Sequence, residues 1–340
     1  MITATVSAVR MRARGAMLGL ALGDALGMPT QAMSRDAIRE RYGAISGLIG
    51  SIPDQPIAPG MVAGSVTDDT EQAILVAQIL VGGQGHIEPM AFAQALIAWE
   101  ESMKRRGSLD LLGPSTKSAI AAIQSGASPT ESGRFGTTNG AAMRVTPVGI
   151  AFPTRSAHEL LAAVVESCQV THFTSIGISG AAAVAGAVSA GIDGLGVDDC
   201  VDFAVEMADA GQKCGNWIAG ASIGSRISWA RQEVRALSET DFKDALYNVV
   251  GTSVQSQESI VAAFAILDRY RDDPFSGLCT AAEIGGDTDT VAAMTGAMFG
   301  AIYGPTVFPE EALGQVQEVS SLSLDPLVDG LLRLRSRHQD

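Results

Sequence analysis

Glu283-Ile-Gly-Gly-Asp-Thr-Asp-Thr-Val-Ala-Ala-Met-Thr-Gly-Ala-Met298 is the stretch that decides the fold, because it joins a glycine turn directly to an apolar helix. Asp287, Asp289 and Thr290 stand where that helix would begin. A helix start exposes unpaired N–H groups and a positive dipole end, so one carboxylate there is ordinary. A helix has a single N-cap position, so two carboxylates and two threonines exceed what capping requires.

A second stretch of the same form, residues 64–80, lies more than two hundred residues upstream. There Thr67, Asp68 and Asp69 stand at the entrance of an apolar-periodic helix, and Asp69 with Gln72 also fits an ordinary capping box. If the two helices pack side by side, four carboxylates meet; they would repel one another and have raised pKa values unless cations lay among them. Asp and Thr oxygens suit hard cations, and four negative charges balance two divalent ions.

Both stretches resemble motifs of the ADP-ribosylglycohydrolase family, which includes the dinitrogenase reductase-activating glycohydrolases and the human ADP-ribosylserine hydrolase. Three more segments resemble that family in the same order along the chain: Gly23-Asp-Ala-Leu-Gly27, Thr138-Asn-Gly-Ala-Ala-Met-Arg144 and Thr171-His172. The resemblance covers nearly the whole chain, from about residue 14 to residue 304. It implies an all-α fold in which residues 1–340 form a single compact multi-helix domain.

The resemblance also implies a metal site at helix N-termini in a central cleft. Two divalent ions, Mg²⁺ or Mn²⁺, would be the cofactors. Asp69 and Asp289 are also catalytic candidates. The six implied metal ligands are Thr67, Asp68, Asp69, Asp287, Asp289 and Thr290.

Two other loops supply candidate contacts to the substrate. The first opens into a helix at Pro114, and a proline with neighbouring hydroxyls such as Ser115 makes a helix start that favours anions. This loop also holds Asp110, a catalytic candidate near the place where the family has an acidic residue that contacts the reacting ribose; an exposed loop carboxylate is the alternative. The second loop resembles the family's loop that wraps ribose and phosphate with backbone N–H groups. Its candidate residues are Asn139, Gly140, Ala141 and Met143.

Arg144 and His172 are each open to two interpretations. Arg144 fits either a ligand clamp or a structural salt bridge. His172 matches a ligand-contacting histidine of the family, so we expect it to bind substrate, although a histidine at a helix end is often only a cap. A zinc site is disfavoured, because no second His or Cys lies at zinc-like spacing.

Gln31 and Glu283 mark the places where the chain departs from the family. Gln31 stands where a flap glutamate is expected; an amide cannot take a proton, so Gln31 is a substrate-binding candidate and not a base. Glu283 is a candidate for the missing catalytic carboxylate, unless it lies on the surface and no extra base is needed. The altered flap leaves two substrate classes open: ADP-ribosyl compounds or proteins, and smaller N-ribosides.

The composition bears on partners and location. The 340 residues are 46% hydrophobic and carry a net charge of −14 with no basic stripe, which argues against a nucleic-acid partner. Four cysteines without C-x-x-C spacing fit a reduced, cytoplasmic protein. The uncharged stretches 173–192 and 290–309 are each long enough to span a membrane, but they are rich in small residues and are expected to be buried helices. The oligomeric state stays open.

Helical periodicity runs through most of the chain, and strand patterns are almost absent. A first helix is expected from Val9 to about Leu26, and its glycines at 15, 19, 23 and 27 would form a flat face for another helix. Further helices are expected at residues 34–42, 69–81, 88–103, 114–124, 156–169, 174–190, 197–210, 217–237, 241–249, 256–270 and 325–337.

The expected function is that of a metal-dependent hydrolase that cleaves a ribosyl glycosidic bond, foremost that of ADP-ribose. No nucleophile–base motif such as G-x-S-x-G is present, which disfavours a serine nucleophile. The competing class is a non-catalytic relative, similar to the family's lens crystallins or to an ADP-ribose-binding protein. All six implied metal ligands are present, which favours an enzyme.

Overall fold

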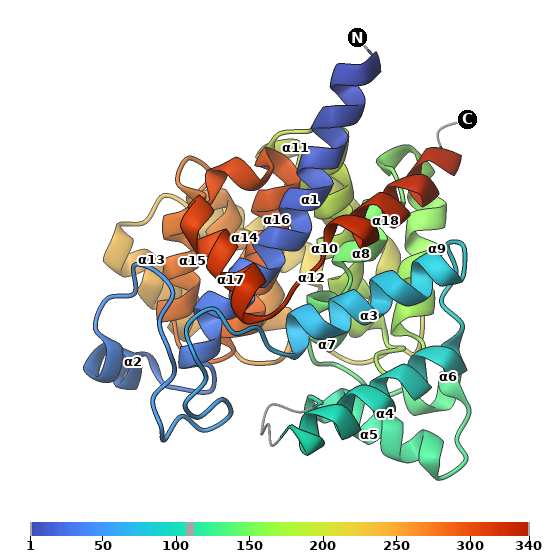
Figure 1. Ribbon diagram of the computed structural model, residues 1–340, viewed down its shortest axis with the longest axis horizontal. Helices are drawn as coiled ribbons and strands as arrows, with labels where there is room; N and C mark the ends of the chain where they lie inside the picture. Colours follow the sequence, from blue (N-terminus) through green and yellow to red (C-terminus); the bar gives the residue numbers. More distant parts are fainter. Residues whose placement is uncertain (1, 107–111, 339–340) are drawn as a thin grey trace.

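The fold is built on two helices whose backbones touch, α1 (Ile2–Gly27) and α16 (Thr288–Tyr303) (Figure 1). A Cβ atom added at Gly19 would lie 2.1 Å from the carbonyl oxygen of Gly296, and one added at Gly296 would lie 2.0 Å from the carbonyl oxygen of Gly19. No side chain fits such a gap, so this contact requires glycine on both helices. The predicted glycine row is therefore a helix contact face.

The two helices run antiparallel, since Gly15 faces Gly300 and Gly27 faces Asp289. At the second of these contacts, a Cβ atom added at Gly27 would lie 2.4 Å from the Cα of Asp289. Every residue of α16 except its last is buried, so this helix lies inside the core. The contact consequently places the acidic start of a buried helix beside the end of α1.

The computed structural model describes residues 2–106 and 112–338, with side chains from residue 7 onward. These residues form helices and no sheet, apart from three isolated β-bridges, which confirms the all-α prediction. The other α-helices are α2 (Arg35–Tyr42), α3 (Asp68–Gly82), α4 (Pro89–Arg105), α5 (Pro114–Gln124), α6 (Pro129–Ser132), α7 (Gly140–Met143), α8 (Thr146–Ala151), α9 (Ala157–Cys168), α10 (Ser175–Asp193), α11 (Val197–Gly211), α12 (Ile223–Glu233), α13 (Glu239–Ala245), α14 (Ser256–Arg269), α15 (Pro274–Glu283), α17 (Glu310–Val319) and α18 (Asp325–Arg337).

α10 is the second buried helix of the core, and it packs against α8, α11 and α16. Among the described residues it is the one helix with the length and hydropathy of a membrane span, at a mean hydropathy of 1.6. All of that window is buried inside the protein. The stretch 173–192 thus forms a core helix as predicted, and the stretch 290–309 forms one as far as Tyr303.

Three predicted helix boundaries are wrong. α1 begins at Ile2 and not at Val9. The helix predicted over 217–237 is only α12, because Ser222 caps its start by accepting the N–H of Ser225 at 3.2 Å. The helix predicted over 241–249 ends as α13 at Ala245 and continues as a π-helical turn, η3 (Leu246–Val250).

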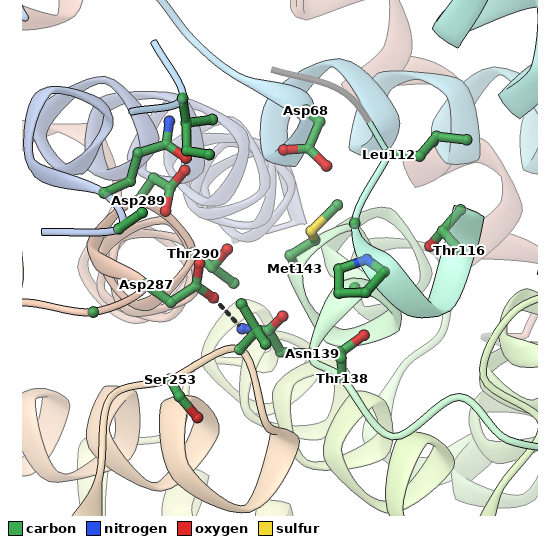
Figure 2. A pocket seen from close by; sticks show the side chains of 18 of the residues that line it. Asp68, Leu112, Thr116, Thr138, Asn139, Met143, Ser253, Asp287, Asp289 and Thr290 are labelled. Carbon is green, nitrogen blue, oxygen red and sulfur yellow. Dashed lines mark hydrogen bonds between the residues drawn. The ribbon is translucent and has the colours of Figure 1, made fainter. Parts of the chain in front are cut away.

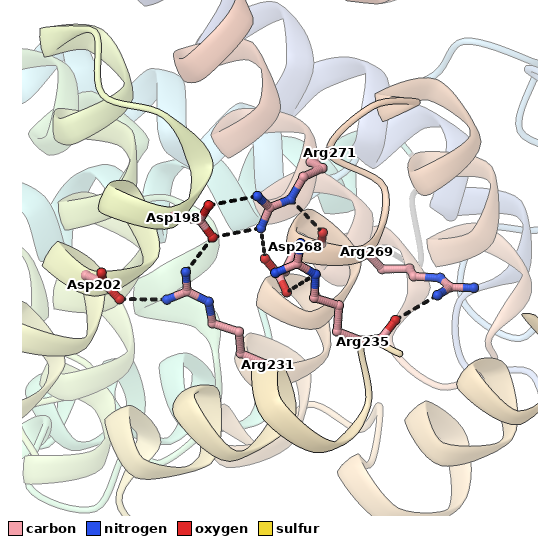
Figure 3. A network of polar contacts seen from close by, with 7 residues as sticks. All are labelled: Asp198, Asp202, Arg231, Arg235, Asp268, Arg269 and Arg271. Atoms are coloured by element: carbon pink, nitrogen blue, oxygen red, sulfur yellow. Dashed lines mark hydrogen bonds and ion pairs between the residues drawn. The ribbon is translucent and has the colours of Figure 1, made fainter. Parts of the chain in front are cut away.

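An ion-pair network joins α11, α12 and the end of α14 (Figure 3). Asp198 accepts hydrogen bonds from Arg231 and Arg271, and these bonds hold the pKa of its carboxyl well below the ordinary range. Asp268, whose side chain is only 2% exposed, pairs with Arg271 and with Arg235. Asp268 is therefore the buried centre of a network that is otherwise on the surface.

Gly19→Ala should lower the free energy of unfolding by about 3 kcal/mol or more, because its methyl group would collide with the backbone of α16. Gly314→Ala is the matched control. Gly314 lies inside α17 with open space at its Cβ position, and alanine is the better helix former by about 1 kcal/mol, so this variant should gain stability. Urea denaturation measures both. If Gly19→Ala were as stable as wild type, the α1–α16 contact would not be tight.

Asp268→Asn should lower the free energy of unfolding by about 1–3 kcal/mol, because it leaves the Arg271 guanidinium without a buried counter-charge. Asp202→Asn serves as the control: this carboxylate also pairs with an arginine of the network but is 66% exposed, so its loss should cost less than about 1 kcal/mol. Both are measured by urea denaturation at neutral pH. If Asp202→Asn lowered the free energy of unfolding more than Asp268→Asn, the exposed ion pair would contribute more to stability than the buried one.

Candidate functional site

An open cavity of about 500 Å³ lies where four helices begin: α3, α5, α7 and α16 (Figure 2). Residues that follow α1 and residues that precede α14 complete its wall. Helix starts present N–H groups that have no partner inside the helix, so the wall offers both side-chain and backbone donors. The predicted cleft at helix N-termini is therefore present.

The acidic end of the cavity begins at the turn Gly285-Gly286. Both glycines have a positive φ, of 81° and 82°, and a Cβ atom at Gly286 would lie 2.3 Å from the carbonyl oxygen of Thr252. The N–H of Asp287 donates to that same carbonyl at 2.7 Å. This turn starts α16 so that the carboxylates of Asp287 and Asp289 line the cavity.

Asn139 orients the Asp287 carboxylate. Its Nδ2 donates to Asp287 Oδ2 at 2.5 Å (Figure 2). It also donates to the Ser259 hydroxyl at 2.9 Å. Its backbone N–H donates to the carbonyl of Val254 at 2.9 Å. Burial raises the pKa of Asp287, and the bond from Asn139 opposes that rise. Asn139, a predicted substrate contact, thus lines the cavity and also positions a carboxylate.

Asp24 fastens the start of α3 to α1. Its carboxylate accepts the backbone N–H of Thr67 at 3.0 Å, the Thr67 hydroxyl at 2.8 Å and the backbone N–H of Thr70 at 3.1 Å. The side chain is fully buried, and that burial raises the pKa of Asp24 to about 6 despite the four hydrogen bonds that these two threonines donate to it. Asp68, the first residue of α3, then lines the cavity.

Asp69 lies behind the cavity wall, between the two helix starts. Its Oδ2 accepts hydrogen bonds from the hydroxyls of Thr67 and Thr290, each at 3.3 Å. Its Oδ1 is buried and has no hydrogen-bond partner among the described residues. Burial raises the pKa of Asp69 well above the ordinary range, and the charges of Asp289 and Asp68 raise it further. The two acidic stretches therefore meet.

The donor chemistry of this end fits a hard divalent cation. All six predicted ligand side chains offer oxygen, which Mg²⁺ and Mn²⁺ prefer. A cation would satisfy Asp69 Oδ1 and offset the repulsion from Asp289 and Asp68, which adds to the effect of burial on the pKa of Asp69. In the described residues, no three His, Cys, Asp or Glu side chains are already arranged as a coordination sphere. The fit therefore rests on the donors and on the orphaned oxygen.

His172 supports the opposite end of the cavity and is not part of its wall. The ring is fully buried, with Nε2 at 2.9 Å from the Thr138 hydroxyl and Nδ1 at 2.8 Å from the Thr171 hydroxyl. Burial holds the pKa of His172 well below the ordinary range, and the nearby Arg144 lowers it further, so the ring is neutral. The prediction of a direct ligand contact is corrected: His172 positions Thr138, which lines the cavity.

Of the other residues predicted to contact substrate at this end, some line the cavity and some lie behind its wall. Gly140 and Met143, two of the predicted substrate contacts, line the cavity. Ala141 is buried, and Ser115 lies behind the wall, where its hydroxyl accepts the N–H of Thr138 at 3.5 Å.

Arg144 is neither a ligand clamp nor one half of a salt bridge within the described part of the chain. It is 1% exposed and donates to Gln72 Oε1 and to the Thr171 hydroxyl, each at 2.6 Å. Gln72 in turn donates to Asp68 Oδ2 at 2.9 Å. Burial lowers the pKa of Arg144 to about 10. Arg144 therefore holds the residue that orients Asp68.

Gln31 lines the cavity and is 6% exposed, and its Nε2 has no hydrogen-bond partner in the described structure. Glu283, the predicted substitute for a flap carboxylate, points elsewhere: its carboxylate accepts the N–H of Ile45 at 2.6 Å and pairs with Lys243 at 3.0 Å. Contrary to the prediction, Glu283 is therefore not at the cavity wall, and it anchors the loop after α2. Asp110 lies outside the described residues.

Thr116 and Lys117 also line the cavity, and the sequence analysis missed them. Both belong to the first turn of α5, directly after Ser115. The signal was present, because that helix start was predicted to favour anions. Ser115, the residue predicted from that helix start, is not among the residues that line the cavity.

Comparison with known proteins identifies one family over nearly the whole chain. The chain matches the model of the ADP-ribosylglycohydrolase family over residues 5–340. It is 30% identical over 329 residues to an Escherichia coli (strain K12) protein described as uncharacterized protein YegU, covering 96% of this chain and 98% of that one. It is 25% identical over 343 residues to the ADP-ribosyl-[dinitrogen reductase] glycohydrolase of Rhodospirillum rubrum, covering 97% and 98%. A solved structure described as an ADP-ribosylglycohydrolase-related protein complex has the same fold, with a TM-score of 0.72 at 21% identity over 96% of this chain and 99% of that one.

Asp69→Asn should raise the melting temperature in chelator at pH 7, because it removes a buried charge from the acidic end. A carboxyl whose folded pKa is raised loses stability as pH rises through that pKa, so wild type should also weaken between about pH 4 and pH 7, a window that includes the Asp24 pKa of about 6. The stability of Asp69→Asn should decline less than that of wild type as the pH rises through this window. Asp272→Asn, at an exposed carboxylate, is the control. A melting temperature several degrees lower for Asp69→Asn in chelator contradicts the expected repulsion.

Proposed function

The chain belongs to the ADP-ribosylglycohydrolase family, and from that premise we propose that it hydrolyses the glycosidic bond between ADP-ribose and an acceptor group. The observation that carries the proposal is the meeting of two acidic helix starts at one end of a cavity. The cavity volume of about 500 Å³ is in the range of small-molecule sites.

We further propose that the acidic end holds two divalent ions, Mg²⁺ or Mn²⁺. When bound, such ions supply Lewis acidity that lowers the pKa of a water molecule, and they reduce the repulsion among the surrounding carboxylates. The oxygen-only donor set and the orphaned Oδ1 of Asp69 support this assignment. The residues that would hold the ions are Thr67, Asp68, Asp69, Asp287, Asp289 and Thr290.

The chain's own residues would then act on the ribose. Hydrolysis of a glycosidic bond builds positive charge on the sugar ring, and the carboxylates of Asp68, Asp287 and Asp289 at the cavity wall stabilise that charge. Asn139 keeps Asp287 in place. Gln31 can donate a hydrogen bond to the substrate from its unpartnered Nε2 but cannot accept a proton.

Three possibilities remain for what this cavity binds: two classes of substrate and a ligand that is bound without being hydrolysed. The Rhodospirillum rubrum relative is named for an ADP-ribosylated protein, which makes a protein-linked substrate one candidate. The amide of Gln31 in the cavity favours a second candidate, a smaller N-riboside whose release needs no flap carboxylate. A non-catalytic binding protein is the third, and calorimetric titration with magnesium separates it from an enzyme, since it should show no tight two-site binding.

Asp289→Asn should reduce ribosyl-bond hydrolysis by at least about a hundredfold, because it removes a cavity carboxylate that stabilises developing charge. Chelation of divalent ions should have the same effect on wild type. The assay uses ADP-ribosyl-arginine, ADP-ribosyl-serine, O-acetyl-ADP-ribose and simple ribosides, and Asp272→Asn is the surface control. Activity that survives both the substitution and the chelator would rule out the proposed metal-dependent mechanism.

A further inference from the structure

We propose that Gln55, which is not part of the cavity wall, is a positioning residue that holds the Gln31 amide in place for the ligand. This role rests on the proposed function, because it concerns how the same cavity recognises its substrate. Gln55 lies in the α2–α3 loop, residues 43–67, which contains no helix or strand (Figure 1). A loop of this length inside a compact domain usually has a function.

The α2–α3 loop is fastened to the rest of the protein near both of its ends. At the first end, Glu283 accepts the backbone N–H of Ile45 at 2.6 Å. At the other end, Gln315 Nε2 donates to the carbonyl of Ala63 at 3.0 Å. The middle of the loop reaches the cavity, where Ile57 lines the wall. The position of this middle part therefore depends on further contacts.

Gln55 provides such a contact through both polar atoms of its side-chain amide. Its Nε2 donates to the carbonyl of Gln31 at 2.7 Å. Its Oε1 accepts the N–H of Ile57 at 2.5 Å and also the N–H of Ala58. The residue is only 3% exposed, so the contact is shielded from water. One buried amide therefore joins two residues of the cavity wall, Gln31 and Ile57.

The three hydrogen bonds require an amide group. One end of the side chain faces two N–H donors and the other end faces a carbonyl, so it must both accept and donate. A carboxylate has no donor for the Gln31 carbonyl, and a methionine side chain has no N–H or O–H donor at all. Because a buried polar group that loses its partner is penalised, glutamine fits position 55 in a way that neither replacement does.

The turn that follows Gln31 is strained and is held from two sides. Ala32 has a φ of 58°, in the left-handed region that is unfavourable for a residue other than glycine. From one side, the N–H of Ala32 donates to the carbonyl of Gly286 at 2.8 Å, and the N–H of Gly286 donates to the carbonyl of Met33 at 2.9 Å. From the other side, Gln55 holds the Gln31 carbonyl. Strained backbone persists only where its surroundings fix it, so loss of the Gln55 bond should loosen this turn.

The same turn places a hydrogen-bond donor in the cavity wall. Gln31 is 6% exposed, and its Nε2 has no hydrogen-bond partner in the described structure. A buried donor without a partner is costly unless a ligand supplies an acceptor. Through Ala32 the turn is bonded to Gly286, which directly precedes Asp287 of the acidic end. A shift of the turn would therefore move this donor relative to the carboxylates, and Gln55 acts on the ligand through Gln31.

Hydrogen exchange tests the Gln55 contact without any ligand. In Gln55→Met, the N–H groups of Ile57 and Ala32 should exchange about tenfold faster than in wild type, because the loop and the turn lose their common partner. Gln55→Glu keeps an acceptor for Ile57 but has no donor for Gln31, so it should speed exchange at Ala32 alone. Ser51→Ala is the matched control, since the Ser51 hydroxyl bonds to backbone groups within the same loop. Circular dichroism checks that each variant is folded.

Calorimetry with ADP-ribose, using the full chain with magnesium present, tests the effect on the ligand. Gln55→Met and Gln31→Ala should each weaken ADP-ribose binding about threefold to tenfold, because the first displaces and the second removes one hydrogen-bond donor. The double variant should bind at most about twofold more weakly than Gln31→Ala, because Gln55 acts through Gln31. A purely structural contact would instead weaken binding by the same factor with and without Gln31. Ser51→Ala should leave the affinity unchanged.

The outcomes separate the role of Gln55 from the proposed function. If wild type binds ADP-ribose and Gln55→Met binds it equally well, or weakens it equally in the Gln31→Ala background, the positioning role is overturned while the hydrolase proposal stands. If wild type neither binds ADP-ribose nor hydrolyses any ADP-ribosyl compound, the proposed function fails, and exchange at Ala32 decides. Faster exchange in both Gln55 variants would then support the hold on the Gln31 turn, and unchanged exchange would overturn it.

Discussion

The backbone contact between α1 and α16 is the constraint on which the rest of the structure depends. It sets the start of α16 against Gly27, and Asp24, one turn earlier on α1, holds the start of α3 through Thr67. One helix therefore positions both acidic stretches, although they are more than two hundred residues apart in the sequence. Because the contact has no room for a Cβ atom, the separation of the two acidic helix starts is set by backbone geometry and not by side chains that could adjust.

The buried carboxylates at the acidic end of the cavity lower the stability of the folded protein. Burial raises the pKa values of Asp24, Asp69 and Asp287, so ionising them in the folded protein is unfavourable relative to the unfolded chain. A core that includes two almost fully buried helices, α10 and α16, offsets this cost. Perturbed carboxyl groups gathered in one cavity are a common property of functional sites, which is a physical reason to regard this end as the reactive one.

The sequence predicted helices, a helix contact face and the acidic helix starts, because these depend on residues that are near one another in the chain. The all-α fold was implied by the family resemblance and agrees with the helical periodicity, and the glycine face of α1 follows from the glycine spacing. Surplus carboxylates at two helix starts raised the possibility, now confirmed, that the two acidic stretches meet. Roles that depend on which way a side chain points could not be predicted. Glu283 turns toward Ile45 and Lys243, and His172 toward two threonines, because of neighbours that the sequence does not place. Thr116 was missed for the same reason, since adjacent residues of a helix face different directions.

The pairing of the first helix with the sixteenth also has a consequence for synthesis on the ribosome. α1 ends at Gly27, whereas its partner α16 ends at Tyr303. α1 can therefore pack against α16 only after nearly the whole chain has been synthesised. At about 5–20 residues per second, this wait is roughly 15–55 s. During that time the flat glycine face of α1 is exposed, and its long-range contact is of the kind that slows folding. The acidic end thus cannot assemble on a nascent chain, and a chain truncated before α16 has none.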